Sequence, residues 1–258
     1  MVTGVQFLTS SLAPLIDFVY PPRCPACGEA IGQQSGLCLD CWNTLVIPTD
    51  PGCALCQRPF GEQGPGEGAI CAPCMATPPL HDGIAAATLY NATSRKLVLA
   101  FKHGGRIALA TMLARLMAAR LPSSECERVI VPVPLHRWRL WRRGFNQAAL
   151  LGRELERLGK GKLHPDVLIR RKATPSLGGL SASARRTELQ GAIIVAERLK
   201  PRVDGRDVVL VDDVLTSGAT STACVKALKR AGARTVTIAC FARVLDEALP
   251  VSLQRPSE

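Results

Sequence analysis

The segment Val208-Val209-Leu210-Val211-Asp212-Asp213-Val214-Leu215-Thr216-Ser217-Gly218-Ala219-Thr220 decides the fold of this chain. Its first four residues are all apolar, which is typical of a parallel strand that is buried on both faces. Two acids follow at the predicted end of the strand, and a Thr/Ser/Gly turn leads into a helix expected over 221–230. Ligands of open α/β sheets bind at the carboxyl ends of such strands, so we expect a binding site here.

The turn after the two acids has the composition of a phosphate site. Thr216–Thr220 offers backbone N–H groups, three hydroxyls and the positive end of the following helix, all of which suit a phosphate monoester. Asp212 and Asp213 do not suit phosphate, but they suit ribose hydroxyls or a Mg²⁺ ion. A ribose 5-phosphate that carries a second anionic group would satisfy all of these residues. The plainer alternative is a buried strand with a solvated acidic turn.

Composition and charge limit the number of domains and the kinds of partner that the chain can have. The chain has 258 residues, enough for one large or two modest domains, and its 47% hydrophobic content can fill a core. The 32 basic and 21 acidic residues give a net charge of +11, which favours anionic partners such as phosphorylated metabolites, nucleic acid or an acidic protein. Residues 1–20 lack the basic start of a secretory signal, and no long apolar run predicts a membrane span. We therefore expect a cytoplasmic protein.

Eight of the eleven cysteines form four C-x-x-C pairs near the start of the chain. This spacing lets both thiolates of a pair bind one metal, and two pairs complete a tetrahedral site with four sulfur ligands. Sequential pairing predicts two zinc ribbons, over 24–41 and 53–74, whereas a cross-braced pairing would share the ions differently. The eight predicted zinc ligands are Cys24, Cys27, Cys38, Cys41, Cys53, Cys56, Cys71 and Cys74.

A zinc ion held by four thiolates has no open position, so both ions are predicted to be structural. Disulfides are the alternative, but they need an oxidising compartment. The ribbons could form a docking surface for nucleic acid or protein, or serve only as a scaffold. The remaining cysteines, Cys126, Cys224 and Cys240, are expected to be small buried residues.

A second unusual segment, His136–Gln147, follows a strand expected over 128–133. Arginine captures phosphate or pyrophosphate with two hydrogen bonds, and its planar face stacks on aromatic rings. The interleaved tryptophans, Trp138 and Trp141, also fit a platform for single-stranded nucleic acid, and a solvated charge run is the plainer alternative. The arginines of this segment are Arg137, Arg139, Arg142 and Arg143.

Strands and helices alternate through the rest of the chain, which predicts a parallel α/β sheet flanked by helices. Gly232 is expected just past the end of the helix over 221–230. The basic, glycine-containing stretch 168–195 is consistent with a lid over an anionic ligand or with a surface loop, and the turn 102–106 is either an anion contact or a basic helix connection. The expected strands are 84–90, 128–133, 192–195, 207–212 and 234–241. The expected domains are residues 1–80 (an N-terminal helix and a double zinc ribbon), 81–246 (the α/β domain) and 247–258 (a tail).

These motifs resemble those of known proteins. The segment 208–220 resembles the phosphoribosyl pyrophosphate (PRPP) signature of type I phosphoribosyltransferases. Together with P-V-P-L-H-x-x-R-x-x-x-R-G-F-N-Q over 132–147 and the paired cysteines, it resembles the ComF family, bacterial phosphoribosyltransferase-like proteins linked to competence and DNA uptake. The resemblance runs from about residue 15 to residue 245.

The resemblance implies a Mg²⁺-dependent phosphoribosyltransferase with an unidentified acceptor. Asp212 and Asp213 would hold the ribose hydroxyls and Mg²⁺, the 216–220 turn would bind the 5-phosphate, and the arginines of 137–143 would face the pyrophosphate. This chain departs from the family pattern at Leu177 and Glu188, which indicates a different acceptor or a weakened activity. The second hypothesis is therefore a non-catalytic DNA-processing or uptake factor that binds single-stranded DNA or a helicase of uptake or replication restart.

Overall fold

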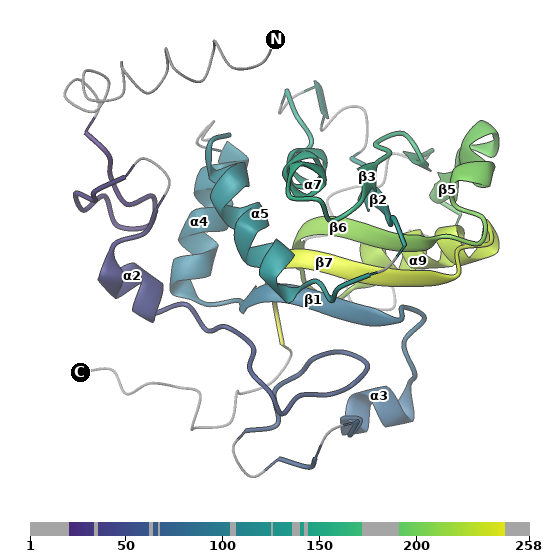
Figure 1. Cartoon of the computed structure of the whole chain (residues 1–258), viewed down its shortest axis with the longest axis horizontal. Coiled ribbons are helices and arrows are strands. Elements are labelled where there is room, and N and C mark those ends of the chain that lie inside the picture. Colours follow the sequence, from purple (N-terminus) through teal and green to yellow (C-terminus); the bar gives the residue numbers. More distant parts are fainter. Residues whose placement is uncertain are drawn as a thin grey trace.

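The structure is a computed structural model with a five-stranded parallel sheet at its centre (Figure 1). The strand order is β1-β7-β6-β2-β3, so the strand that carries the two acids lies in the middle. The strands are β1 (Gly83–Leu89), β2 (Val129–Pro132), β3 (Lys162–Leu163), β6 (Asp207–Leu215) and β7 (Thr235–Arg243). The description covers residues 21–33, 36–61, 64–66, 68–103, 107–124, 126–135, 140–141, 144–171 and 191–245.

Helices cover both faces of the sheet, which explains why its central strands are apolar without alternation. Successive residues of β6 point to opposite faces: Val209 and Val211 pack under α4, α5 and α7, whereas Val208 and Leu210 pack with α9. These helices are α4 (Ala92–His103), α5 (Leu109–Arg120), α7 (Gln147–Arg157) and α9 (Ala219–Arg230). The predicted α/β fold with a flanked parallel sheet is therefore confirmed.

One predicted strand is not part of this sheet. The segment β5 (Ile193–Val195) pairs antiparallel with β4 (Leu168–Arg170) in a separate two-stranded sheet. The expectation that β5 extends the parallel sheet was wrong, because its short apolar run finds its partner at the other end of the proposed lid segment. A 3-10 helix, η1 (Glu197–Arg202), then leads back to β6.

The two ribbons lie on opposite sides of the β1 edge. Leu45, after the first ribbon, belongs to the core under α4 and α5, whereas the second ribbon's cysteines belong to the core that contains α9. Between the ribbons, Val46 forms a bridge with Leu89 at the end of β1. Their short helices are α2 (Leu39–Asn43) and α3 (Ala72–Ala76). The ribbons are thus packed on the α/β domain (Figure 1).

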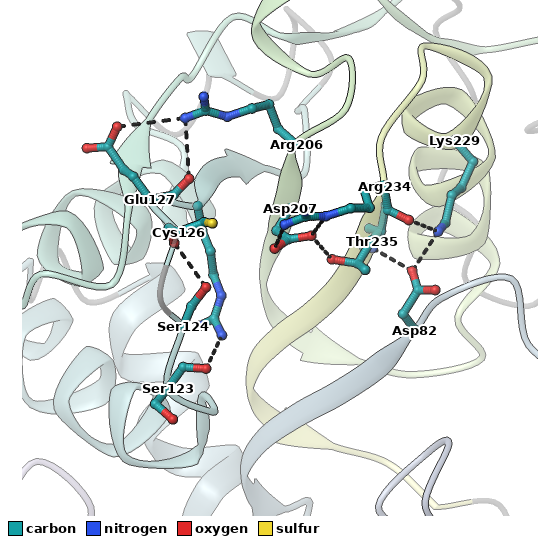
Figure 2. Close-up of polar contacts among 12 residues, drawn as sticks. Asp82, Ser123, Ser124, Cys126, Glu127, Arg206, Asp207, Lys229, Arg234 and Thr235 are labelled. Atoms are coloured by element: carbon teal, nitrogen blue, oxygen red, sulfur yellow. Dashed lines mark hydrogen bonds and ion pairs between the residues drawn. The ribbon is translucent and has the colours of Figure 1, made fainter.

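Polar contacts join the starts of β6, β7 and β1, at the sheet end opposite the two acids (Figure 2). The Arg234 guanidinium donates to both carboxylate oxygens of Asp207, at 2.8 and 2.5 Å, and the Thr235 hydroxyl donates to the same carboxylate at 2.7 Å. Lys229 of α9 pairs with Asp82 at 2.7 Å. The hydrogen bonds from Arg234, first, and Thr235 lower the pKa of Asp207 to about 2.

Other details confirm or correct the sequence analysis. Gly232 follows α9 with φ of 92°, the conformation expected of a glycine that ends a helix. Cys224 and Cys240 are buried, but Cys126 is exposed beside Arg206 and Arg234, so its predicted burial was wrong. Within the described part of the chain, no helix has the length and apolar character that crossing a membrane requires.

Candidate functional site

Two clusters of four cysteines have the geometry of zinc sites. In each cluster the sulfur atoms lie within 4.8 Å of one another, with Sγ–Sγ distances of 3.5 Å for Cys27–Cys38 and 3.7 Å for Cys56–Cys71. With Zn–S bonds of about 2.3 Å, a tetrahedral site separates its sulfurs by roughly 3.8 Å. The clusters are residues 24, 27, 38, 41 and residues 53, 56, 71, 74, which confirms the sequential pairing and gives two four-cysteine sites that fit zinc.

The two zinc sites differ in exposure. All four ligands of the second site are buried, and they pack in the same core as Ile84 of β1. In the first site only Cys24 is buried, and Cys27 is exposed. Backbone N–H groups support a sulfur in each site, from Cys41 to Cys38 Sγ and from Cys71 to Cys53 Sγ. The second site is therefore part of the main core, whereas the first site is peripheral.

The acid pair lies near the carboxyl end of β6. The strand continues to Leu215, three residues beyond the predicted end, so Asp213 lies within it as well as Asp212. The reason is the neighbouring strand: β7 continues to Arg243 and pairs with Asp212, Val214 and Leu215. The Asp213 backbone N–H donates to Asp212 Oδ1 at 2.9 Å, and both acids line the same cavity.

Lys102 faces the acid pair from α4. Its Nζ lies 2.8 Å from Asp213 Oδ2, and the two side chains are only 23% and 11% exposed. In the sequence, Lys102 belongs to a basic stretch that predicts a turn between helices, and nothing there connects it with the acids. Only the folded structure brings this pair together, because its residues are 111 positions apart in the sequence.

The electrostatics of the pair favour a bound cation. Burial and the nearby Asp213 carboxylate raise the pKa of Asp212, and Lys102 opposes that rise. Two carboxylates this close retain a proton readily unless a positive charge compensates them. Lys102 provides one such charge, and a divalent cation would provide a stronger one.

The predicted phosphate turn follows β6 directly. Gly218 has φ of 70°, a left-handed conformation that favours glycine, and it is the N-cap of α9. The helix begins at Ala219, two residues earlier than predicted, so Thr220 lies in its first turn. That turn carries no acidic residue, and the first N–H groups of a helix have no partner within it. The arrangement suits an anion.

One cavity of about 330 Å³ joins the acid pair to this turn. Asp212, Asp213 and residues 216–220 all line it, as the sequence analysis predicts for one ligand. Lys102, Asn146 and Arg170 form other parts of its wall. Asn146 donates from Nδ2 to the Val133 carbonyl and accepts from Ala148 N–H, so it fixes the start of α7 beside the cavity.

Arg170 and Asn146 were not assigned as site residues from sequence, although both lie in segments noted there. Arg170 is buried on β4, at the base of the proposed lid, and its position depends on the β4–β5 pairing. Arg137, Arg139, Arg142 and Arg143 lie outside the described residues, as do Leu177 and Glu188. Trp141, between these arginines, is 80% exposed.

Comparisons with known proteins agree with this architecture. Residues 15–75 match the model of the double zinc ribbon domain, and residues 142–253 match that of the phosphoribosyl transferase domain. A segment of 56 residues is 46% identical to ribose-phosphate pyrophosphokinase of Corynebacterium glutamicum, covering 22% of this chain and 17% of that protein. The chain is thus a double zinc ribbon protein with a phosphoribosyltransferase-type domain.

Full-length relatives define the family. The chain is 32% identical over 228 residues to DNA utilization protein YhgH of Salmonella typhimurium, covering 86% of this chain and 90% of the relative. It is also 32% identical over 228 residues to competence protein F of Haemophilus influenzae, covering 86% and 96%. The chain belongs to the family of competence protein F and YhgH, the ComF family.

Proposed function

We propose that this protein binds PRPP, or a related phosphorylated ribose, together with Mg²⁺ and transfers the phosphoribosyl group to an acceptor. The supporting observation is the single cavity that contains the acid pair and the phosphate turn. A ribose 5-phosphate needs an anion site and a site for its hydroxyls at a short distance, and residues 212–213 and 216–220 provide both.

The roles of the residues follow from their chemistry. The N–H groups and hydroxyls of Thr216–Thr220 would bind the 5-phosphate. Asp212 and Asp213 would contact the ribose hydroxyls and hold Mg²⁺, an ion that prefers carboxylate oxygens. Lys102 would then move from Asp213 toward an anionic group of the ligand. Arg137, Arg139, Arg142 and Arg143 would neutralise the pyrophosphate.

The transfer requires no protein nucleophile. The bond between ribose C1 and the pyrophosphate oxygen breaks, pyrophosphate leaves with the electron pair, and the acceptor's lone pair forms the new bond to C1. The protein must stabilise charge on the leaving group, align the acceptor and exclude water. Buried Arg170, at the base of the 168–195 segment, supports a lid role for that segment.

The cellular setting forms part of the proposal. The names of the relatives, DNA utilization protein and competence protein, support a link to DNA uptake. Four-thiolate zinc sites need reduced cysteines, which favours the cytoplasm. We retain residues 1–80, 81–246 and 247–258 as the proposed ribbon domain, α/β domain and tail.

The second candidate is a non-catalytic factor that binds single-stranded DNA or a helicase. Exposed Trp141 among four arginines favours it, because an accessible aromatic ring between cationic groups can stack on a base. In this case the cavity would sense a nucleotide or PRPP rather than catalyse transfer.

Pyrophosphate release tests the catalytic proposal. The zinc-loaded chain would be incubated with Mg²⁺, PRPP and a panel of nucleobases and amines, beside Asp212→Ala/Asp213→Ala and the control Arg115→Gln, whose exposed residue lies on α5. We expect acceptor-dependent release by wild type and the control only. Release that persists in the double variant would refute the assigned roles.

Binding to single-stranded DNA across a salt series tests the second candidate. A binder that neutralises several phosphates loses affinity steeply as salt rises, with a logarithmic slope of about −0.7 per phosphate. Trp141→Ala should weaken such binding severalfold with little change in slope, because it removes stacking and leaves the charges. Equal affinity in Trp141→Ala would remove the main support for this candidate.

A further inference from the structure

A second cavity, of about 510 Å³, lies on the other side of the phosphate turn. Its walls come from three parts of the chain: Arg58 of the second ribbon, the connecting segment 77–81, and the α/β domain through the end of β6, α9 and Arg243. It therefore exists only where the ribbon packs on the domain.

The phosphate turn separates the two cavities. Thr216–Ala219 and Ser221 line both of them, whereas Lys102, Asp212 and Asp213 line only the first. A molecule in the second cavity would contact the turn without contacting the acid pair. The second cavity is thus a distinct site that shares one wall with the proposed phosphoribosyl site.

The lining of this cavity combines two cationic residues with apolar ones. Arg58 and Arg243 contribute guanidinium groups, and no aspartate or glutamate occurs among its described lining residues. Leu80, Ile84 and Ile238 are among its apolar residues. Pockets for small molecules combine such apolar walls with a few polar groups that fix orientation.

Two buried polar atoms of this cavity's residues lack a partner in the described structure: Arg58 Nε and His81 Nδ1. Such atoms are normally satisfied, because an unpaired buried group costs about 1–3 kcal/mol. Burial and the charge of Arg243 lower the pKa of His81 to about 4. His81 is therefore neutral at pH 7, when one ring nitrogen can donate and the other can accept.

We propose that this cavity binds a small organic anion, in which a carboxylate, sulfonate or phosphate is carried on an apolar or planar body. Arg58 and Arg243 hold the anionic group, His81 provides a further hydrogen bond, and the apolar walls contact the body. Arg243 also donates to the backbone carbonyl of Cys56, which is itself a predicted zinc ligand, so the site connects the second ribbon directly with β7.

Because the two cavities share a wall, a ligand in the second cavity can change the affinity of the first cavity for its own ligand. A molecule that contacts residues 216–219 changes the free energy with which the same turn binds a ligand in the first cavity, and linkage requires the effect to be reciprocal. The second site is thus suited to regulate binding at the first site, although its existence does not depend on the proposed transferase activity.

The test uses anilinonaphthalene sulfonate, a fluorescent anion with a planar body, titrated into the full zinc-loaded chain. Displacement by benzoate, which has an anion and a planar body, is compared with benzyl alcohol, which lacks the anion, and with inorganic phosphate, which lacks the body. The variants are Arg58→Gln, the exposed-arginine control Arg115→Gln, and Thr222→Trp, which fills the second cavity from an exposed position on α9 that does not line the first.

We expect one saturable site in wild type and Arg115→Gln, at least roughly tenfold weaker binding in Arg58→Gln, and loss of binding in Thr222→Trp. Benzoate should displace the probe at least about tenfold better than benzyl alcohol or phosphate, because only benzoate satisfies both parts of the cavity. Zinc content and circular dichroism establish folding, and Thr222→Trp provides the comparison if Arg58→Gln misfolds. Equal affinity in all folded variants, or simple competition between ribose 5-phosphate and the probe, would overturn the proposal.

Discussion

The ion pair between Lys102 and Asp213 provides a quantitative test of the site. Lys102→Met removes the ammonium group but keeps an unbranched apolar side chain on α4. Asp213, only 11% exposed in its side chain, then remains beside Asp212 without the cation now 2.8 Å away. The two carboxylates must share a proton or repel each other, so the variant is expected to be less stable than wild type.

The size of the expected stability loss in Lys102→Met follows from how deeply Lys102 and Asp213 are buried. Breaking a fully buried pair by removing one partner costs about 3–5 kcal/mol, and an exposed pair contributes about 0–1 kcal/mol. Side chains that are 23% and 11% exposed lie between these limits, so we expect a loss of about 1–3 kcal/mol. At about 2–4 °C for each kcal/mol, the Tm should fall by roughly 2–12 °C.

Thermal and urea unfolding measure this loss, with Lys96→Met as the control because Lys96 is exposed on the same helix. The Asp213→Asn variant and the double variant complete a double-mutant cycle, whose coupling energy should exceed about 1 kcal/mol. Mg²⁺ should restore part of the stability of Lys102→Met, since it supplies the missing charge. A loss no larger than that of Lys96→Met, with coupling below about 0.5 kcal/mol, would refute the electrostatic account.

Three further predictions concern other parts of the molecule. Asp207→Asn should be less stable than wild type above pH 4; because the Asp207 pKa is lowered to about 2, the difference should shrink between pH 4 and pH 2 in urea unfolding. Cys74→Ser, at the buried zinc site, should lower the Tm more than Cys27→Ser at the exposed one, by about 2–4 °C for each kcal/mol of difference; equal shifts would contradict the difference in packing. Gly218→Ala should cost about 1–2 kcal/mol because φ is 70°, and it should weaken phosphate binding in calorimetry; unchanged stability and affinity would show that the turn tolerates a side chain.

Much of the fold could be predicted because its signals are local. The apolar run before Asp212 predicts a central parallel strand, and the C-x-x-C spacings predict two zinc sites with four sulfur ligands each. The β4–β5 pairing could not be predicted, because a three-residue strand has no periodicity that identifies its partner. Likewise, the strand extension to Leu215 depends on β7, which supplies hydrogen bonds from outside the segment.

The candidate site likewise has features that the sequence predicts and features that it does not. Residues 212–220 are contiguous in sequence, so the acid pair and the phosphate turn could be assigned together, and one cavity contains both. Lys102 and Arg170 reach that cavity from distant elements, and their own segments indicate only basic character. The second cavity could not be predicted from the sequence at all, because its walls meet only when the ribbon packs on the α/β domain.

Calorimetric titration of PRPP with Mg²⁺ into the zinc-loaded protein, beside Asp212→Ala/Asp213→Ala, tests the central claim most directly. The account predicts one binding site per chain in wild type and no measurable binding in the double variant. Absence of binding by wild type, or equal binding by both proteins, would contradict the claim that residues 212–220 form a phosphoribosyl site.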